Sequence, residues 1–453
     1  MLVLSGTASP NIIMEKRVSI SLETRLNLPR EMATFKCGEE FVVVSPEDGN
    51  WLVVSDVQRQ FLRQLGAGMT VGDVMAIAQD KDACKTLVKQ ILARRFTERG
   101  LIVSNCRKAF FYLTYDCNLR CEHCYMYAQK NRGDQLSPTE YSAIFEKLKR
   151  NGVAEVTFSG GEPLMRSDFW QIVKCARDVD LKPRVFSNGT LWTELDIERA
   201  KEYLIDVQIS IDGVDEASNA IVRGANVFDR AKEVAVKLAK SGVDVVIATT
   251  PVLGNSDVIE HGYADFVHEM QRMSDGRIRF RVAQDLLPGR NTVEMTPKEK
   301  QEYVQRGIRL YEIANSGGAK IPFFDEFKKW RGREVCGLGR LVFSPDGYVY
   351  VCNRMDSFPA IGNIRSCPVE KLLKKAKDRI AAASVDNTIP CRDCALRHVC
   401  GGGCRAERFE KVSCSLEESS VHNPCSERYK MLLLEIMVHT TRACYKWGRE
   451  FYE

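Results

Sequence analysis

The stretch that decides the fold reads CNLRCEHC, from Cys117 to Cys124, and it closely follows the apolar run Ala109 to Thr114. It places Cys117, Cys121 and Cys124 in one short loop with the spacing C-x3-C-x2-C. Three thiolates alone do not complete a tetrahedral zinc site, but they can bind three irons of a [4Fe–4S] cubane and leave the fourth iron open. An open iron can bind a substrate and pass an electron to it. The alternative for this loop is a zinc or redox site.

Strands and helices alternate on the C-terminal side of this run. The expected strands cover 109–114, 155–159, 184–187, 207–211, 243–249 and 278–282. Helical patterns lie between them, for example over 138–150, 168–178 and 226–241. Apolar strands separated by helices predict a parallel sheet, and six such units predict a partial (β/α)6 barrel. In such barrels the loops after the strands carry the reactive groups, and the cysteine loop stands in that place.

Three further motifs follow strands of this pattern. Gly160-Gly161-Glu162-Pro163 follows the second strand, Ser187-Asn188-Gly189-Thr190 the third and Ser210-Ile211-Asp212-Gly213 the fourth. The carboxyl ends of parallel strands meet at one edge of a sheet, so all three motifs should converge with the cysteine loop. Together they resemble the radical S-adenosylmethionine (SAM) superfamily over the whole middle segment.

This resemblance implies a role for each motif. Cys117, Cys121 and Cys124 would bind a [4Fe–4S] cluster, whose open iron would chelate the amino and carboxylate groups of SAM. The glycines would let the backbone approach the methionyl group, and the adjacent glutamate would accept its ammonium. The implied SAM-binding residues are His123 (near the adenine), Gly160, Gly161, Glu162, Ser187, Asn188, Ser210 and Arg223 (on the SAM carboxylate).

A second group of cysteines lies near the C-terminus. Its spacing is Cys391-x2-Cys394-x5-Cys400-x3-Cys404, with Cys336 and Cys352 upstream and Cys425 downstream. The pattern resembles the SPASM extension, which carries two auxiliary [4Fe–4S] clusters and would bring the total to three. The resemblance assigns Cys391, Cys394, Cys400 and Cys425 to an outer cluster and Cys336, Cys352 and Cys404 to an inner one. Zinc is the alternative.

The inner cluster lacks one cysteine that some members of this family have. Residues 330–335 contain no cysteine, so the inner cluster can have an open iron unless Cys367 or Cys414 completes it. An open iron there could bind a substrate thiolate. The same C-terminal segment also predicts a hairpin over 341–351 and an amphipathic helix near 428–445.

The N-terminal segment has a different pattern. Two β-rich runs, 41–44 and 51–54, flank a turn, and helical patterns follow over 55–65, 70–79 and 81–99, with a further strand at 101–103. A hairpin with three helices predicts a winged-helix-like domain and resembles the peptide-recognition element of peptide maturases. Such an element binds a leader peptide as an added strand, and the basic third helix suits an acidic leader. A DNA-binding winged helix or a structural cap are the alternatives.

The predicted fold class is therefore α/β. A tail (1–19) precedes a winged-helix-like leader-recognition domain (20–105), a partial (β/α)6 radical SAM barrel (106–324) and a cysteine-rich SPASM domain with two auxiliary iron–sulfur clusters (325–453). With 453 residues and 44% hydrophobic content, the chain is long enough for several such cores.

Charge and cysteine use exclude several classes. A net charge of +5 without a long basic run does not favour a nucleic-acid partner. Neither a signal peptide nor a sufficiently long apolar window is present, so we expect no membrane association. The 17 cysteines flank a cysteine-free middle stretch, which favours metal ligation in a reducing compartment, the cytoplasm.

The predicted function is a radical SAM oxidoreductase that modifies a ribosomally synthesised precursor peptide. SAM would be cleaved to a 5′-deoxyadenosyl radical, which takes hydrogen from an unactivated carbon. A thioether crosslink is the first choice, with carbon–carbon or other side-chain crosslinks, epimerisation or decarboxylation as alternatives. An electron donor such as flavodoxin or ferredoxin is implied, while the general base is unknown.

Two rival classes are a sulfatase-maturing oxidase and a non-catalytic peptide-binding escort. The sulfatase-maturing enzymes have an aspartate base where this chain has Asn353, whose amide cannot act as a base. The escort differs from the enzyme in producing no 5′-deoxyadenosine.

Overall fold

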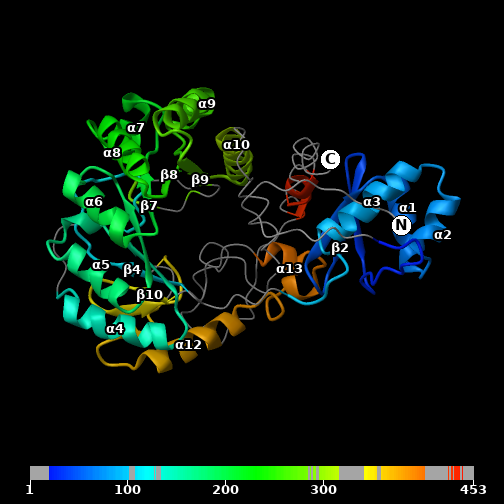
Figure 1. Ribbon diagram of the computed structural model, residues 1–453, viewed down its shortest axis with the longest axis horizontal. Helices are drawn as coiled ribbons and strands as arrows, with labels where there is room; N and C mark the ends of the chain where they lie inside the picture. The colour runs from blue at the N-terminus through cyan, green and yellow to red at the C-terminus, as the bar shows by residue number, and fades with distance from the viewer. Residues whose placement is uncertain are drawn as a thin grey trace. The chain divides into compact units, whose positions relative to one another are not determined.

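The computed structural model describes residues 20–101, 108–126, 128, 134–283, 286, 289–291, 295–315, 341–354 and 359–402, and 427, 430–431, 433–438 and 441 near the C-terminus. The chain forms two compact units (Figure 1). One unit contains 105–321 and 337–381, and we call it the barrel unit. The other contains 1–104, 322–336 and 382–453, and we call it the terminal unit. The segment predicted as one C-terminal domain thus contributes to both units.

The barrel unit is built on six parallel strands. They are β4 (Lys108–Tyr112), β5 (Glu155–Ser159), β6 (Lys182–Ser187), β7 (Asp206–Ser210), β8 (Val245–Thr249) and β9 (Ile278–Val282), hydrogen-bonded in that order. Each strand pairs with the next in parallel register, for example Phe111 with Phe158. The predicted partial barrel and its six strands are confirmed, with end shifts of one or two residues.

Helices connect these strands and cover the outside of the barrel (Figure 1). They are α4 (Pro138–Arg150), α5 (Phe169–Asp178), α6 (Glu194–Tyr203), α7 (Glu216–Arg223), α8 (Phe228–Ser241), α9 (Ser256–Met273) and α10 (Pro297–Asn315), with the short 3-10 helix η1 (Pro163–Met165) after β5. None of the helices that the structure describes combines the length and apolar character that a bilayer crossing needs.

The helix α4 shows how the sequence determines one of these elements. Ser137 and Glu140 form a capping box at its start, and Pro138 occupies a first-turn position where a missing N–H has no effect. Its buried side chains, Tyr141, Ile144, Phe145 and Leu148, recur at helical spacing. The ring of Phe145 meets Phe111 of β4 at 5.3 Å between centroids, so the helix is held by the strand that precedes the cysteine loop.

Three short strands extend the barrel sheet beyond β4. They are β10 (Leu341–Phe343), β11 (Tyr348–Tyr350) and β12 (Gly362–Asn363), followed by α12 (Val369–Ala382). The strand β10 pairs in parallel with β4, and Phe343 stacks on Phe111 at 4.4 Å. The predicted hairpin over 341–351 is confirmed as β10 and β11.

The terminal unit contains a three-stranded antiparallel sheet. Its strands are β1 (Ala33–Cys37), β2 (Glu40–Ser45) and β3 (Asn50–Val54), and the helices α1 (Asp56–Gly66), α2 (Val71–Ile77) and α3 (Lys81–Ala93) follow. The predicted hairpin and three helices are confirmed as elements. The strand β1 was not predicted, because its sequence ATFKC is short and only partly apolar. Leu101 is not in a strand, and 102–103 lie outside the described residues.

Both faces of this sheet are covered. One face packs on the helices through Val43, Leu52 and Val54. The other face packs through Val42, Val44 and Trp51 against a C-terminal group of side chains. That group is Leu396, Val399, Leu433, Leu434, Met437 and Val438, the last four in a helix described at 427, 430–431, 433–438 and 441. The predicted C-terminal helix is confirmed at these positions.

Candidate functional site

The cysteine loop begins five residues after β4, and its three thiols are half-buried. The backbone N–H of Leu119 donates to Cys117 Sγ at 3.4 Å. Burial raises the pKa of the Cys117 thiol to about 12 and also raises that of Cys121. These sulfurs therefore become good ligands only when a metal displaces their protons.

The glycine motif after β5 packs directly against this loop. A Cβ on Gly161 would lie 2.0 Å from the carbonyl oxygen of Asp116, and one on Gly160 would lie 2.4 Å from that of Thr114. The N–H of Gly161 donates to Thr114 O at 2.8 Å, and the N–H of Glu162 donates to Asp116 O at 2.7 Å. Only glycine permits this approach, so the motif holds the base of the cysteine loop in place.

Glu162 is a fully buried carboxyl group at the same place. It accepts hydrogen bonds from Ser187 Oγ at 2.9 Å, from the N–H of Asn188 at 2.8 Å and from the N–H of Leu164 at 3.3 Å. Burial raises its pKa to about 7, although these bonds oppose the rise. A cation beside this carboxylate would therefore gain a strong, desolvated partner.

The motif after β6 connects Glu162 with the cysteine loop. Ser187 Oγ, which donates to Glu162, also accepts from Trp192 Nε1 at 3.0 Å. Asn188 Nδ2 donates to Asn118 Oδ1 at 2.9 Å inside the cysteine loop. In the structure these two predicted site residues orient other site groups. Ser210, the last residue of β7, is half-buried.

A charged cluster lies on the other side of the loop. Asp212 Oδ2 lies 2.7 Å from Arg223 Nη2 and 3.2 Å from His123 Nε2. Arg223 Nη1 in turn lies 3.9 Å from Cys121 Sγ. Burial lowers the pKa of His123, although Asp212 opposes this, so a neutral ring is favoured. Arg223 and His123 were predicted site residues, whereas Asp212 was missed although it stands in the motif after β7.

Several buried polar atoms around this cluster have no hydrogen-bond partner among the described residues. They are His123 Nδ1, Arg223 Nε, Asn219 Nδ2 and Asp212 Oδ2, the last of which forms ion pairs without hydrogen-bond geometry. Buried polar atoms are normally satisfied, so the donors Arg223 Nε and Asn219 Nδ2 indicate a ligand with acceptor groups. His123 Nδ1 is an acceptor on a neutral ring whose Nε2 faces Asp212, and it would take a donor from the ligand. Among all the residues that the structure describes, no three His, Cys, Asp or Glu side chains converge on a point that would hold one ion. Cys117, Cys121 and Cys124 need not converge on one ion to hold a cubane, because each sulfur would bind a different iron.

A pair of tyrosines links the cysteine loop with Cys352. Tyr112 and Tyr125 place their hydroxyl oxygens 3.1 Å apart, and Tyr112 OH donates to the carbonyl oxygen of Asn353 at 2.9 Å. Tyr125 directly follows Cys124, and Asn353 directly follows Cys352. The barrel unit thus brings one predicted inner-cluster ligand within two hydrogen bonds of the loop. Cys336 and Cys404 lie outside the described residues.

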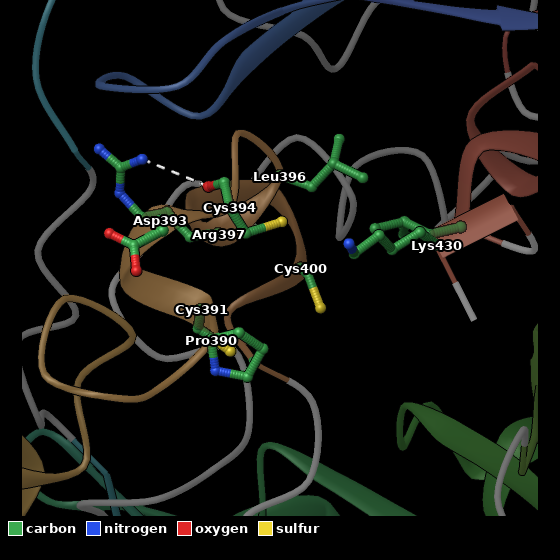
Figure 2. Close-up of a pocket in the computed structure, with 10 residues that line it drawn as sticks. Pro390, Cys391, Asp393, Cys394, Leu396, Arg397, Cys400 and Lys430 are labelled. Carbon is green, nitrogen blue, oxygen red and sulfur yellow. Dashed lines mark hydrogen bonds between the residues drawn. The ribbon is translucent and has the colours of Figure 1, made fainter. Parts of the chain in front are cut away.

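The predicted outer-cluster cysteines line a cavity of about 210 Å³ in the terminal unit (Figure 2). Cys391 begins the 3-10 helix η2 (Cys391–Asp393), Cys394 follows it, and Cys400 ends the short helix α13 (Arg397–Cys400). Lys430 reaches the same cavity from the C-terminal helix. Cys425, the fourth predicted ligand, lies outside the described residues.

A buried histidine fixes the position of this cysteine segment. His398 Nδ1 lies 2.6 Å from the carbonyl oxygen of Pro46 in the β2–β3 turn, and its Nε2 lies 2.8 Å from Asp386 Oδ1. A Cβ on Gly49 would lie 2.9 Å from the carbonyl oxygen of His398. His398 is not among the predicted site residues, because nothing in the neighbouring sequence distinguishes it from a surface residue.

Known proteins resemble this chain in sequence and fold. The family model of the radical SAM superfamily matches residues 111–262. Mycofactocin maturase MftC of Mycolicibacterium smegmatis is 30% identical over 333 residues, which cover 69% of this chain and 81% of MftC. The structure of Streptococcus suis SuiB bound to precursor peptide SuiA matches with a TM-score of 0.52 and 16% identity, over 88% of this chain and 99% of SuiB. The structure of anSMEcpe with bound AdoMet matches with a TM-score of 0.57 and 20% identity, over 75% of this chain and 99% of that chain. The two structures support the fold and MftC shows the family, so the chain belongs to the radical SAM superfamily and is an enzyme of the SPASM-type peptide maturase group.

Proposed function

We propose that this protein installs an intramolecular crosslink, first of all a thioether, in a ribosomally synthesised precursor peptide. The observation that carries the proposal is the meeting of three thiols, a buried carboxylate and a buried guanidinium at one edge of the barrel. The names of relatives support a peptide substrate: MftC is called a mycofactocin maturase, and SuiB is seen bound to precursor peptide SuiA.

The residues at this edge match the groups of SAM. Cys117, Cys121 and Cys124 would hold a [4Fe–4S] cluster, and that cluster would supply the electron for cleavage of SAM to methionine and the 5′-deoxyadenosyl radical. Glu162 offers its buried carboxylate to the SAM ammonium, and Arg223 offers the guanidinium to the SAM carboxylate. His123 stands where the adenine is expected. With Nε2 on Asp212, the Nδ1 of a neutral ring is an acceptor that has no partner among the described residues.

Two other groups of residues support the SAM site indirectly. Gly160 and Gly161 hold the cysteine loop against β5, and Ser187 and Asn188 orient Glu162 and the loop. Such supporting contacts fix the geometry that a short-lived radical requires. Ser210 would complete the ribose side of the site.

The thioether proposal rests on the second group of cysteines. Replacing an S–H and a C–H bond by one S–C bond removes two hydrogens from the peptide. One leaves as a hydrogen atom with 5′-deoxyadenosine, and the other leaves as a proton and an electron that an acceptor must take. Auxiliary clusters on Cys391, Cys394, Cys400 and Cys425 and on Cys336, Cys352 and Cys404 would supply that acceptor.

We further propose that residues 20–105 bind the leader of the precursor. Within the three-stranded sheet, β1 and β3 are the outer strands, and an extended peptide can pair with such an edge. The basic third helix is partly engaged inside the unit, since Arg94 lies over the Trp51 ring at 3.7 Å and donates to Thr441 Oγ1 at 3.1 Å. Lys81 and Lys89 are then the cations of this helix that we assign to an acidic leader.

The test uses the anaerobically reconstituted full chain with SAM and dithionite. We expect 5′-deoxyadenosine and methionine, measured by mass spectrometry, and with the cognate precursor a peptide that has lost two hydrogens and one free thiol. A peptide that loses two hydrogens but keeps every thiol would replace the thioether by a carbon–carbon crosslink. Absence of 5′-deoxyadenosine from iron-loaded protein would support the escort and overturn the proposal.

A further inference from the structure

We infer that Asp212 is a positioning residue that holds Arg223 and the cysteine loop in the one arrangement that accepts SAM. The inference rests on the proposed SAM site, and it assigns a role to a residue that the proposed SAM contacts leave without one. Its carboxylate is the meeting point of two elements that must stay in register: α7, which ends at Arg223, and the loop that contains His123.

Asp212 is itself fixed from several sides. It is completely buried, two residues beyond β7. Its N–H donates to Asn219 Oδ1 at 2.9 Å, and its carbonyl oxygen accepts from Asn255 Nδ2 at 2.6 Å. Its Oδ1 accepts from the N–H of Thr250 at 2.7 Å, so the carboxylate is anchored to the chain after β8.

The neighbouring glycine makes this tight turn possible. A Cβ on Gly213 would lie 2.2 Å from the backbone nitrogen of Asn219, in the middle of α7. Any other residue at 213 would push α7 away from the end of β7, and Arg223 would move with it. The close packing of the backbone therefore fixes the position of the Asp212 carboxylate relative to α7.

The other carboxylate oxygen acts on the site. Oδ2 contacts Arg223 Nη2 and His123 Nε2, and the neighbouring backbone adds a bond from the N–H of Glu122 to the carbonyl oxygen of Val222 at 3.0 Å. Arg223 thus has one nitrogen on Asp212, a second 3.9 Å from Cys121 Sγ, and a third, Nε, that has no partner among the described residues. Nε is thus a buried donor that a ligand beside the thiols could satisfy.

Loss of the Asp212 charge has a defined consequence. A buried guanidinium without its counter-ion is strongly disfavoured, so Arg223 would leave its place or take another partner. Residues that orient groups binding a ligand or metal typically change affinity by about ten- to a hundredfold when substituted. We expect Asp212→Asn to weaken SAM binding in this range while the three thiols still bind iron.

The control is a second buried carboxylate that also has an arginine partner. Asp206, at the opposite end of β7, is also a buried carboxylate and lies 2.9 Å from Arg184 Nη2. Asp206→Asn removes this ion pair at the end of β7 that is remote from Asp212. It therefore reports the general effect of losing a buried ion pair. Each reconstituted full-length variant is measured for iron and sulfide content, SAM affinity by equilibrium dialysis, and the electron paramagnetic resonance change that SAM produces in the reduced cluster.

A double substitution separates positioning from simple loss of structure. If Asp212 acts through Arg223, then Asp212→Asn combined with Arg223→Met should bind SAM no more weakly than Arg223→Met alone. Asp212→Glu keeps the buried charge, so it serves where Asp212→Asn takes up too little iron. Its longer side chain displaces Arg223, and it too should raise the dissociation constant for SAM at full iron content.

The outcomes decide between the possibilities. Normal SAM affinity and spectra in an iron-loaded Asp212 variant would overturn the inference, as would fully additive losses in the double variant. Failure of both Asp212 variants to load iron, with Asp206→Asn loading normally, would make Asp212 a structural residue only. If the wild-type protein with full iron content bound no SAM, the proposed function itself would fail.

Discussion

The two cysteine sites of this molecule differ in what surrounds their thiols. In the barrel unit, Cys117 and Cys121 lie beside charged groups, Glu162 and Arg223, and several nearby donors have no partner among the described residues. In the terminal unit, Asp393, Arg397 and Lys430 also line the cysteine cavity, but Cys394 and Cys400 belong to a segment that packs on a sheet through Leu396 and other apolar side chains. The first arrangement suits a ligand that enters and leaves, whereas the second suits a group that stays.

The difference also shows in how each loop is held. The first loop is held by backbone hydrogen bonds to the neighbouring strands and by charges, including the bond from Glu162 N–H to Asp116 O. The second is held by hydrophobic contact and by one histidine between Pro46 and Asp386. Substitutions at the two sites should therefore fail in different ways.

The largest effect is expected from Cys121→Ala. With two thiolates left, the cubane loses one of its three protein ligands, and the cleavage of SAM should fall to background. The measurement is 5′-deoxyadenosine yield from reduced, reconstituted protein. Cys175→Ala is the control, since this half-buried thiol on α5 donates only a weak bond to Pro138 O at 3.9 Å and should leave the yield unchanged.

Gly161→Ala should come close to that loss without touching a ligand. The new Cβ would overlap the carbonyl oxygen of Asp116, so the cysteine loop must move. We expect reduced iron content per chain and little SAM cleavage. At Gly254 the nearest atom to a new Cβ is 3.6 Å away, so Gly254→Ala should retain both properties. Normal activity in Gly161→Ala would mean that the loop tolerates displacement.

Cys394→Ala tests the other site. Because the cavity belongs to a different compact unit from the cysteine loop, SAM cleavage should be largely spared while the modified peptide is not formed. Iron content should fall by about four atoms per chain, the content of one cubane. Equal loss of 5′-deoxyadenosine and of peptide product would show that the terminal site is merely structural.

The pH dependence of SAM binding sharpens the comparison at the first site. Burial raises the pKa of Glu162 to about 7, and only the ionised carboxylate attracts the SAM ammonium. The dissociation constant for SAM should therefore rise as the pH falls below about 7, by up to about tenfold per pH unit. Glu162→Gln should bind weakly and remove this trend.

Glu140→Gln is a suitable control for the pH profile. Its hydrogen bond with Arg365 lowers the pKa of Glu140 to about 2, so it does not titrate in the measured range. A profile that rises below pH 7 in Glu162→Gln as well would assign the titration to another group.

Much of the first site could be predicted, because its information is local. The thiols, Gly161 and Glu162 stand in short motifs at the ends of apolar strands, and parallel strands bring such ends together. What the sequence did not reveal depends on contacts between distant segments. Asp212 matters because of its contacts with Arg223 and His123. The hydrogen bond that the Ser187 hydroxyl accepts from Trp192 likewise depends on the packing of the folded chain.

The terminal unit was less predictable for the same reason. Its three helices follow from capping residues such as Ser55 and Thr70, which form capping boxes in the structure. The strand β1 carries little hydrophobic signal of its own and is specified by pairing with β2. That residues near 40 and residues near 396 share one core cannot be read from either segment alone.

The smallest effect is expected from His398→Ala, which tests how the second site is held. The substitution removes a buried contact with Pro46 O and a part-buried contact with Asp386 Oδ1, and a buried group left without its partner typically costs about 1–3 kcal/mol. Hydrogen exchange of the backbone amides in β2, β3 and α13 should become faster, while SAM cleavage in the barrel unit persists. His261→Ala is the control, because this ring is exposed and its hydrogen bond among the described residues is to the carbonyl oxygen of Asp257 in its own helix. Unchanged exchange in His398→Ala would mean that apolar packing alone fixes the cysteine segment, and the contrast between the two sites would then rest on the charges of the first.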